Sequence, residues 1–130
     1  MFDKYTVLVR EFQNVEDNGR VVGFQLKVRI AYYRGVFLPL IGGFDVAVDG
    51  QRFDQRQLQL SIGGRTYTME ELGKEETARW SFGEAATLTI LHPGGLKPGT
   101  HDVEVVQTVF PGYMPDGFIA TFRRKMTLVA

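Results

Sequence analysis

The chain contains no cysteine, and this absence excludes several kinds of chemistry at once. Without a thiol there is no disulfide, no thiolate zinc site and no cysteine nucleophile. A chain of 130 residues can still bury roughly two thirds of the surface that it exposes when unfolded. We therefore expect residues 1–130 to fold as a single domain without disulfides or a structural metal.

The chain also lacks an excess of charge of either sign. Fifteen basic and fifteen acidic residues cancel and are interspersed, so no footprint for nucleic acid or anionic lipid is expected. The longest basic run, Arg123-Arg124-Lys125, is interpreted as an ordinary strand face rather than a phosphate site.

Long apolar runs are missing as well. No window approaches the ~18 apolar residues of a transmembrane helix. Residues 1–10 lack the basic start and long apolar stretch of a secretory signal. We therefore expect a cytoplasmic protein.

Helical periodicity is nearly absent, whereas alternation of apolar and polar residues runs through most of the chain. The clearest case is residues 22–30, where Val22, Phe24, Leu26, Val28 and Ile30 point one way. Further strands are predicted at residues 5–12, 44–48, 58–62, 65–69, 78–82, 86–91, 102–109 and 119–129. Short strands at this spacing predict an all-β fold, an antiparallel immunoglobulin-like β-sandwich of about eight to nine strands.

Two glycine-containing dipeptides predict tight turns between strands. Asp49-Gly50 and Gly63-Gly64 suit turns with positive φ and therefore predict two hairpins. The one helical signal lies at residues 68–73, where Thr68 and Glu71 have the spacing of a capping box. At most one short helical turn is expected there.

The search for catalytic groups is mostly negative, and no catalytic residue is predicted. His92 and His101 bracket residues 93–100, where a hairpin would bring the two imidazoles together. A metal would need a third ligand that the sequence does not identify, so two solvated loop histidines are favoured over a metal site. A glycosidase would need a pair of carboxylates, but the acidic cluster at Glu70, Glu71, Glu75 and Glu76 reads as an ordinary helix terminus.

The segment after residue 30 differs from an ordinary loop because it is apolar and carries only one charge. Consecutive strand residues face opposite sides, so Tyr32 and Tyr33 cannot both enter one core. Tyr and Arg among apolar neighbours are typical interface anchors. We therefore predict a partner interface at Tyr32, Tyr33, Arg34, Gly35, Phe37, Leu38, Tyr113 and Met114.

Three segments carry a resemblance to a known family: F-Q-L-K-V-R-I-A-Y-Y-R-G at residues 24–35, G-G-R-T-Y-T-M-E-E-L at 63–72 and P-G-G-L-K-P-G at 93–99. The likeness extends from F-D-K-Y at residues 2–5 to Y-M-P at 113–115. In the order and spacing of these segments the chain resembles the small (β) subunit of bacterial C-glycoside deglycosidases.

This resemblance implies a β-sandwich subunit bound to a larger TIM-barrel α subunit, similar to sugar isomerases and epimerases, in a hetero-oligomer. The α subunit would carry a divalent metal, usually manganese, and this chain would hold no cofactor. The complex would act as a carbon–carbon lyase that splits 3-oxo-C-glycosides into a sugar and a flavonoid-type aglycone by elimination. The small subunit itself would be non-catalytic and would stabilise its partner.

Two other functions stay open at this point. The runner-up is a stand-alone carbohydrate-binding β-sandwich module that uses exposed tyrosine rings as stacking platforms. The third is a structural sandwich that self-associates, which would form an oligomer whose population depends on concentration.

Overall fold

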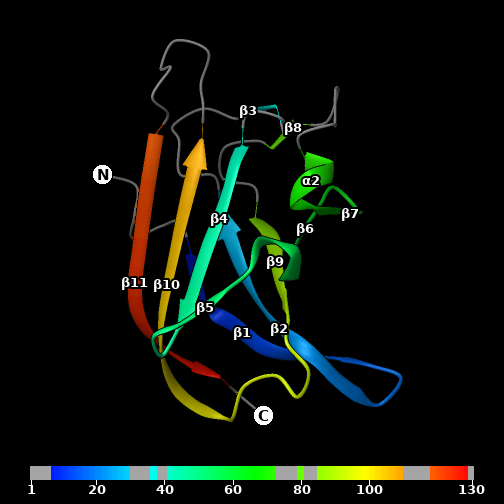
Figure 1. Cartoon of the computed structure of the whole chain (residues 1–130), viewed down its shortest axis with the longest axis vertical. Coiled ribbons are helices and arrows are strands. Elements are labelled where there is room, and N and C mark those ends of the chain that lie inside the picture. Colours follow the sequence, from blue (N-terminus) through cyan, green and yellow to red (C-terminus); the bar gives the residue numbers. More distant parts are fainter. Residues whose placement is uncertain are drawn as a thin grey trace.

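The structure is a computed structural model that describes residues 7–29, 36–37, 41–72, 79–80, 85–109 and 118–128. Side chains are described for residues 12–29, 43–72, 85–108 and 119–128. Within these ranges the chain forms two antiparallel sheets packed face to face (Figure 1). The predicted all-β sandwich is confirmed.

The first sheet has five strands in the order β1 (Val7–Asp17), β2 (Arg20–Arg29), β9 (Ala85–Leu91), β6 (Leu58–Ile62) and β7 (Arg65–Thr68). The second has four, in the order β11 (Phe118–Leu128), β10 (Gly99–Val109), β4 (Ile41–Val48) and β5 (Gln51–Phe53). A two-stranded pair, β3 (Val36–Phe37) with β8 (Arg79–Trp80), lies beyond one end of the sandwich (Figure 1).

The core lies between the sheets and is built by alternation. In β2, Leu26 and Val28 are fully buried while Lys27 between them is half-buried. Full burial of an apolar side chain such as Leu26 contributes roughly 1.5–3 kcal/mol to the stability of the fold. The aromatic part of the core is an edge-to-face set in which the Phe24 ring lies 5.4 Å from Phe53 and 6.1 Å from Phe12.

Three hairpins close at turns whose two central residues have positive φ. Asp49-Gly50 joins β4 to β5 and Gly63-Gly64 joins β6 to β7, as predicted. A third turn, Asn18-Gly19, joins β1 to β2 with φ of 52° and 78°. Such paired positive φ values match the right-handed twist of the flanking strands.

The helical content of the described residues consists of single turns. In α2 (Met69–Leu72) the Thr68 amide donates to Glu71 Oε1 (2.9 Å) and the Glu71 amide donates to Thr68 Oγ1 (3.1 Å), which is the predicted capping box. A 3₁₀ turn, η2 (Gln55–Gln57), is capped by Asp54 and was not predicted. In the described part of the chain, neither turn has the length or the apolar character needed to cross a membrane.

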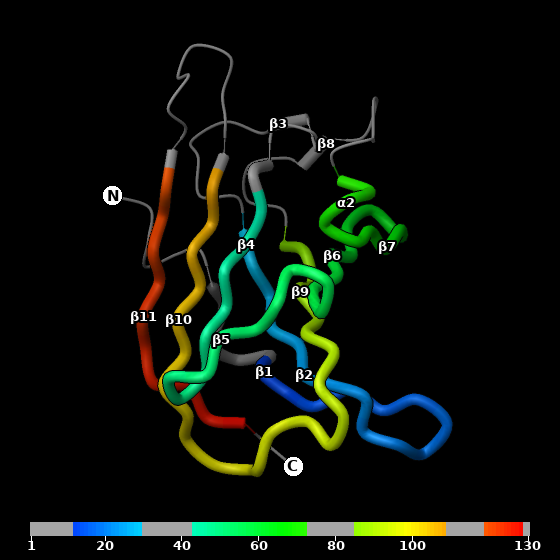
Figure 2. The backbone as a smooth tube through the Cα atoms, in the orientation of Figure 1, coloured from blue at the N-terminus to red at the C-terminus, as the bar shows by residue number. Residues whose placement is uncertain are grey.

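The connection from β9 to β10 crosses from one sheet to the other at the end of the sandwich away from β3 and β8 (Figure 2). It is held on both sides. The Asn14 side chain of β1 accepts from the Leu96 amide and donates to the Leu96 carbonyl, both at 2.9 Å. One residue later, the Lys97 carbonyl lies 2.6 Å from His101 Nε2 in β10.

His101 also binds the β4–β5 turn. Its Nδ1 lies 2.6 Å from Asp49 Oδ2, and Asp49 Oδ1 accepts from the Asp102 amide at 2.8 Å. The hydrogen bond to the Asp49 carboxylate, followed by the bond to the Lys97 carbonyl, raises the pKa of His101. The same bond to His101, followed by the Asp102 amide, lowers the pKa of Asp49. The charged pair therefore joins a turn, a strand and a crossover.

Gly23 generates a first prediction, because a Cβ atom there would lie 2.0 Å from the Ile90 carbonyl oxygen. Gly23→Ala should force the β2 and β9 backbones apart and lower the unfolding free energy by about 1–3 kcal/mol. Gln25→Ala, on the outer side of the same strand, should change it by less than about 0.5 kcal/mol. Urea unfolding of both variants gives the comparison, and equal stability would contradict the close approach.

The His101–Asp49 pair generates a second prediction. The raised pKa of His101 gives stability that is present below its ordinary value of 6.5 and is lost as pH rises through the raised value. The lowered pKa of Asp49 gives stability that is present above 3.8 and is lost as pH falls through the lowered value. The pair should therefore stabilise the fold most between pH 3.8 and 6.5.

Asp49→Asn is the matched variant, since Asn also tolerates the positive φ of 51° at this turn. The difference in unfolding free energy between the parent chain and Asp49→Asn should be largest near pH 5 and should shrink toward pH 9. Denaturant titrations at both values measure this difference. A difference that does not change with pH would show that the charged pair does not stabilise the fold.

Candidate functional site

The eight residues predicted as a partner interface lie outside the described side chains. Tyr32, Tyr33, Arg34, Gly35, Leu38, Tyr113 and Met114 fall outside the described residues, and Phe37 is described only as backbone in β3. The described strands nevertheless show where their segments are attached. Their interface role stays a prediction.

These attachment points meet at one end of the sandwich. The chain leaves β2 at Arg29 and enters β4 at Ile41, and Ile41 pairs with Val109, where β10 ends. Val109 in turn pairs with Phe118, where β11 begins. Figure 1 shows the ends of β4, β10 and β11 side by side at its upper side, toward β3 and β8.

A buried side chain connects the two sheets near this end. Gln107 has no exposed surface, and its Nε2 donates to the Arg29 carbonyl at 3.2 Å. The bond joins β10 of one sheet to the last residue of β2 in the other. The strand ends from which the segments after Arg29 and Val109 continue are therefore linked to each other by this hydrogen bond.

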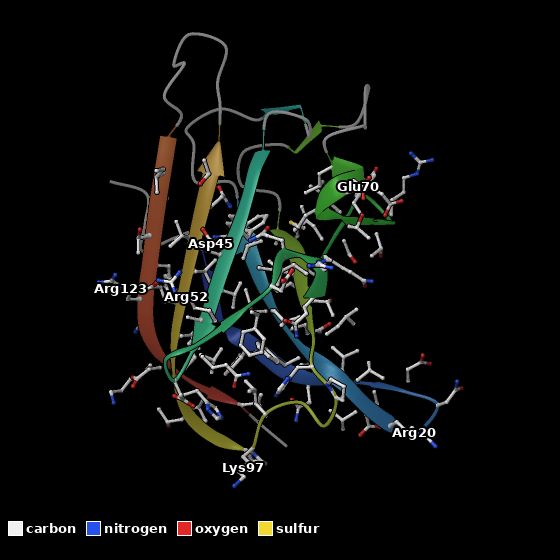
Figure 3. All side chains as sticks on the ribbon, in the orientation of Figure 1. Arg20, Asp45, Arg52, Glu70, Lys97 and Arg123 are labelled. Atoms are coloured by element: carbon white, nitrogen blue, oxygen red, sulfur yellow. The ribbon has the colours of Figure 1, made fainter. Side chains whose placement is uncertain are left out.

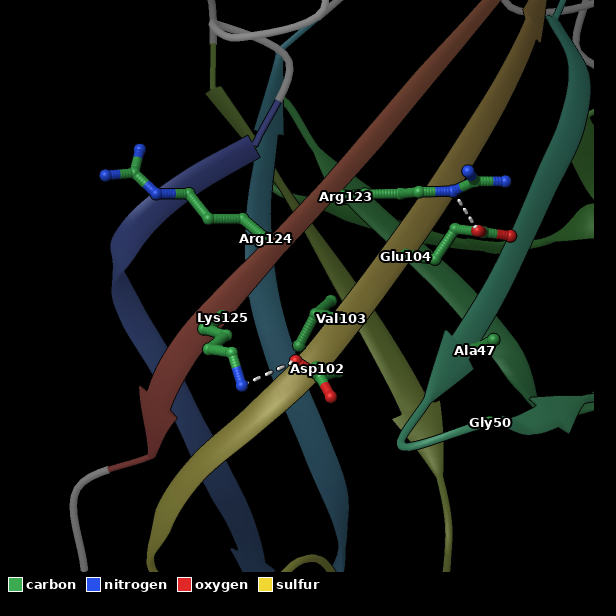
Figure 4. Close-up of a pocket in the computed structure, with 8 residues that line it drawn as sticks. All are labelled: Ala47, Gly50, Asp102, Val103, Glu104, Arg123, Arg124 and Lys125. Carbon is green, nitrogen blue, oxygen red and sulfur yellow. Dashed lines mark hydrogen bonds and ion pairs between the residues drawn. The ribbon is translucent and has the colours of Figure 1, made fainter.

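A hollow of about 440 Å³ lies on the outer face of the second sheet (Figure 4). Its rim carries two cross-strand ion pairs. Arg123 pairs with Glu104, and Lys125 Nζ lies 3.5 Å from Asp102 Oδ1. The small residues Ala47 and Gly50 form part of its lining.

This hollow is a solvated charge ladder rather than a catalytic site. The side chains of Arg123 and Lys125 are both about three quarters exposed, at 75% and 76%, and ion pairs so exposed contribute about 0–1 kcal/mol. In Figure 4, Arg124 points away from this ladder. The prediction that the triplet is an ordinary strand face agrees with this arrangement, and its cations also protect an edge strand from unwanted pairing.

The two histidines do not form the expected pair. The hairpin that would join them is absent because β9 and β10 belong to different sheets. The His92 ring lies 5.4 Å from the Phe53 ring, and only 12% of the His101 side chain is exposed, so the expectation of two solvated loop histidines is wrong. Within the described ranges, no three His, Cys, Asp or Glu side chains gather as metal ligands.

Exposed aromatic platforms are also absent from the part of the chain whose side chains are described. All six aromatic side chains there are buried: Phe12, Phe24, Phe44, Phe53, Tyr67 and Phe122. Sugar-binding modules need exposed rings on which a pyranose can stack. The described surface therefore offers no such platform.

Comparison with known proteins assigns the chain to a family. Residues 2–113 match the family described as C-glycoside deglycosidase beta subunit. A C-glycoside deglycosidase beta subunit from Eubacterium cellulosolvens is 38% identical over 105 residues, which cover 80% of this chain and 71% of the relative. A 3'-dehydrocarminate deglycosidase beta subunit from a Microbacterium species is 27% identical over 94 residues, covering 72% and 70%. The chain thus belongs to the C-glycoside deglycosidase beta subunit family.

Proposed function

We propose that this chain is the non-catalytic small subunit of a C-glycoside deglycosidase complex. Its family membership over residues 2–113 is the observation that carries the proposal. Both relatives are named as beta subunits, and a beta subunit works within an assembly. A TIM-barrel α subunit is the proposed partner.

The proposed reaction cleaves the carbon–carbon bond between a 3-oxo sugar and an aromatic aglycone. The carbonyl at C3 acidifies the proton on C2, and a base of the α subunit removes it. The electron pair then forms the C1–C2 double bond as the C1–aglycone bond breaks, and the aglycone carbon takes up a proton. This elimination needs no oxidant, and the Microbacterium relative is named for a 3'-dehydro substrate.

The residues described in this chain suit a supporting role in that reaction. They bring together no triad of metal ligands, and the hollow on the outer face of the second sheet is lined by surface ion pairs. We therefore place the divalent metal, proposed to be manganese, and the base in the α subunit. The small subunit contributes a sandwich, and we propose that the segments following Arg29 and Val109 contact the partner.

Reconstitution tests the proposed function. The chain and its α subunit are purified separately, and release of aglycone from a 3-oxo-C-glycoside is followed by chromatography. We expect no turnover by this chain alone and turnover by the stoichiometric mixture. Failure of the two proteins to associate, or full activity of the α subunit alone with unchanged stability, would contradict the proposal.

The proposed contact strip gives a mutational prediction. Arg34→Ala and Tyr33→Ala should each weaken binding to the α subunit by ~2 kcal/mol or more, as expected of interface anchors. Arg20→Ala is the matched control, since Arg20 begins β2 at the end of the strand opposite Arg29 (Figure 3). Titration calorimetry measures all three. Unchanged affinity in both strip variants would contradict this assignment.

A further inference from the structure

The outer face of the first sheet is built from rows of polar side chains, most of them uncharged. One row runs Gln13, Gln25, Thr89, Gln59 and Thr68 across five strands, each residue paired with the next. The neighbouring row runs Lys27, Thr87, Ser61 and Thr66 across four. We call this surface, completed by Arg29 and its partner Ala85, the Thr/Gln face.

Hydrogen bonds along the second row order its side chains. Lys27 Nζ donates to Thr87 Oγ1 at 2.5 Å, and the hydroxyls of Ser61 and Thr66 lie 2.8 Å apart. Lys27, Thr87 and Ser61 are half-buried even though they point away from the core. The row is therefore laterally packed and loses little side-chain freedom when another surface covers it.

The charge on the Thr/Gln face is of one sign. Lys27 and Arg29 are its cations, and none of its described side chains is acidic. The chain as a whole has as many acids as bases. On the outer face of the second sheet the cations Arg123 and Lys125 are paired with acids, and Asp45 and Arg52 add one charge of each sign (Figure 3). On the Thr/Gln face, no described carboxylate forms an ion pair with Lys27 or Arg29.

Arg29 supplies a second, independent observation. Its Nε is buried, and among the described residues it has no hydrogen-bond partner. Buried donors are nearly always satisfied, and a guanidinium is satisfied best by a carboxylate. Arg29 also ends β2, where the chain passes into the residue 30–35 segment. A carboxylate from outside the described chain would therefore meet Arg29 beside the proposed contact strip.

From these observations we infer that the Thr/Gln face is a docking surface for a protein that places carboxylates opposite Lys27 and Arg29. This inference rests on the proposed function, because the partner is taken to be the α subunit. Two cations are too few for nucleic acid, whose backbone is read by clusters of basic residues. The described side chains of the face include no aromatic ring for stacking a sugar. A polar surface without acids instead fits a wet, charge-complementary protein interface.

Charge reversal at Lys27 tests the inference. Lys27→Glu should weaken binding to the α subunit at least tenfold, because the new carboxylate would face the partner's acids. Lys125→Glu is the matched control on the outer face of the second sheet and should bind as the parent does. Affinity of the parent should also fall as salt rises from 50 to 500 mM, and this salt dependence should be weaker in Lys27→Gln. Thermal unfolding of each variant alone confirms that it folds.

Thr89→Arg provides a test that leaves Lys27 and Arg29 unchanged. Thr89 lies in the middle of the first row, so a long side chain there should prevent close approach and reduce affinity at least tenfold. If the complex forms and neither Lys27→Glu nor Thr89→Arg changes its affinity, the inference is wrong while the proposed function stands. If the parent chain forms no complex, both are contradicted. If the face instead mediates self-association that Lys27→Glu abolishes, the assignment to a second kind of subunit is wrong.

Discussion

The buried apolar layer between the two sheets is the constraint on which the rest of this structure depends. Phe24, Leu88 and Val105 have no exposed surface, and they meet in this layer from three strands of the two sheets. Because successive strand residues face opposite sides, filling this layer commits every second residue to the outer surface. The sandwich thereby has two outer faces, and no helix of the described chain lies over either of them (Figure 1).

The two outer faces differ in a way that matters for assembly. On the outer face of the second sheet, Glu104 pairs with Arg123 and Asp102 pairs with Lys125. The charges of these four side chains are therefore balanced without a partner protein. On the first sheet, Lys27 and Arg29 lie among hydroxyls and amides without an acid of the same described face. A protein that binds a second subunit can use a surface whose cations pair with no described carboxylate of its own chain, such as the outer face of the first sheet. The crossover and turn contacts of Asn14 and His101 keep the opposite end of the sandwich fixed.

Much of this fold is predictable from local pattern. Alternation located the strands, and Gly63-Gly64 and the Thr68–Glu71 spacing located a turn and a cap, because each depends on residues close in sequence. The Asn18-Gly19 turn carries the same local signal and is not among the predicted turns. The pairing of strands cannot be predicted from local sequence, because it depends on which apolar strips meet across the core. For this reason the sequence wrongly predicts His92 and His101 in one hairpin, although β9 and β10 belong to different sheets.

The same limit applies to the surfaces. Alternation places Lys27 and Arg29 outward, but the absence of described acids around them follows from β9 lying beside β2 and β6 lying beside β9, which no local pattern specifies. The interface at Tyr32 to Leu38 is predicted from composition, from the alternation of strand residues and from the family resemblance, and it stays a prediction. The structure adds the hydrogen bond between Gln107 and the Arg29 carbonyl, which joins the two sheets where β2 ends.

The most direct test of the account is the mass of the intact complex that this chain forms in a native lysate of its own cells. We predict recovery of a TIM-barrel partner at a defined stoichiometry, with release of aglycone from 3-oxo-C-glycosides by the recovered complex. Recovery of the folded chain alone, as a monomer, would contradict the central claim that it is the small subunit of a deglycosidase.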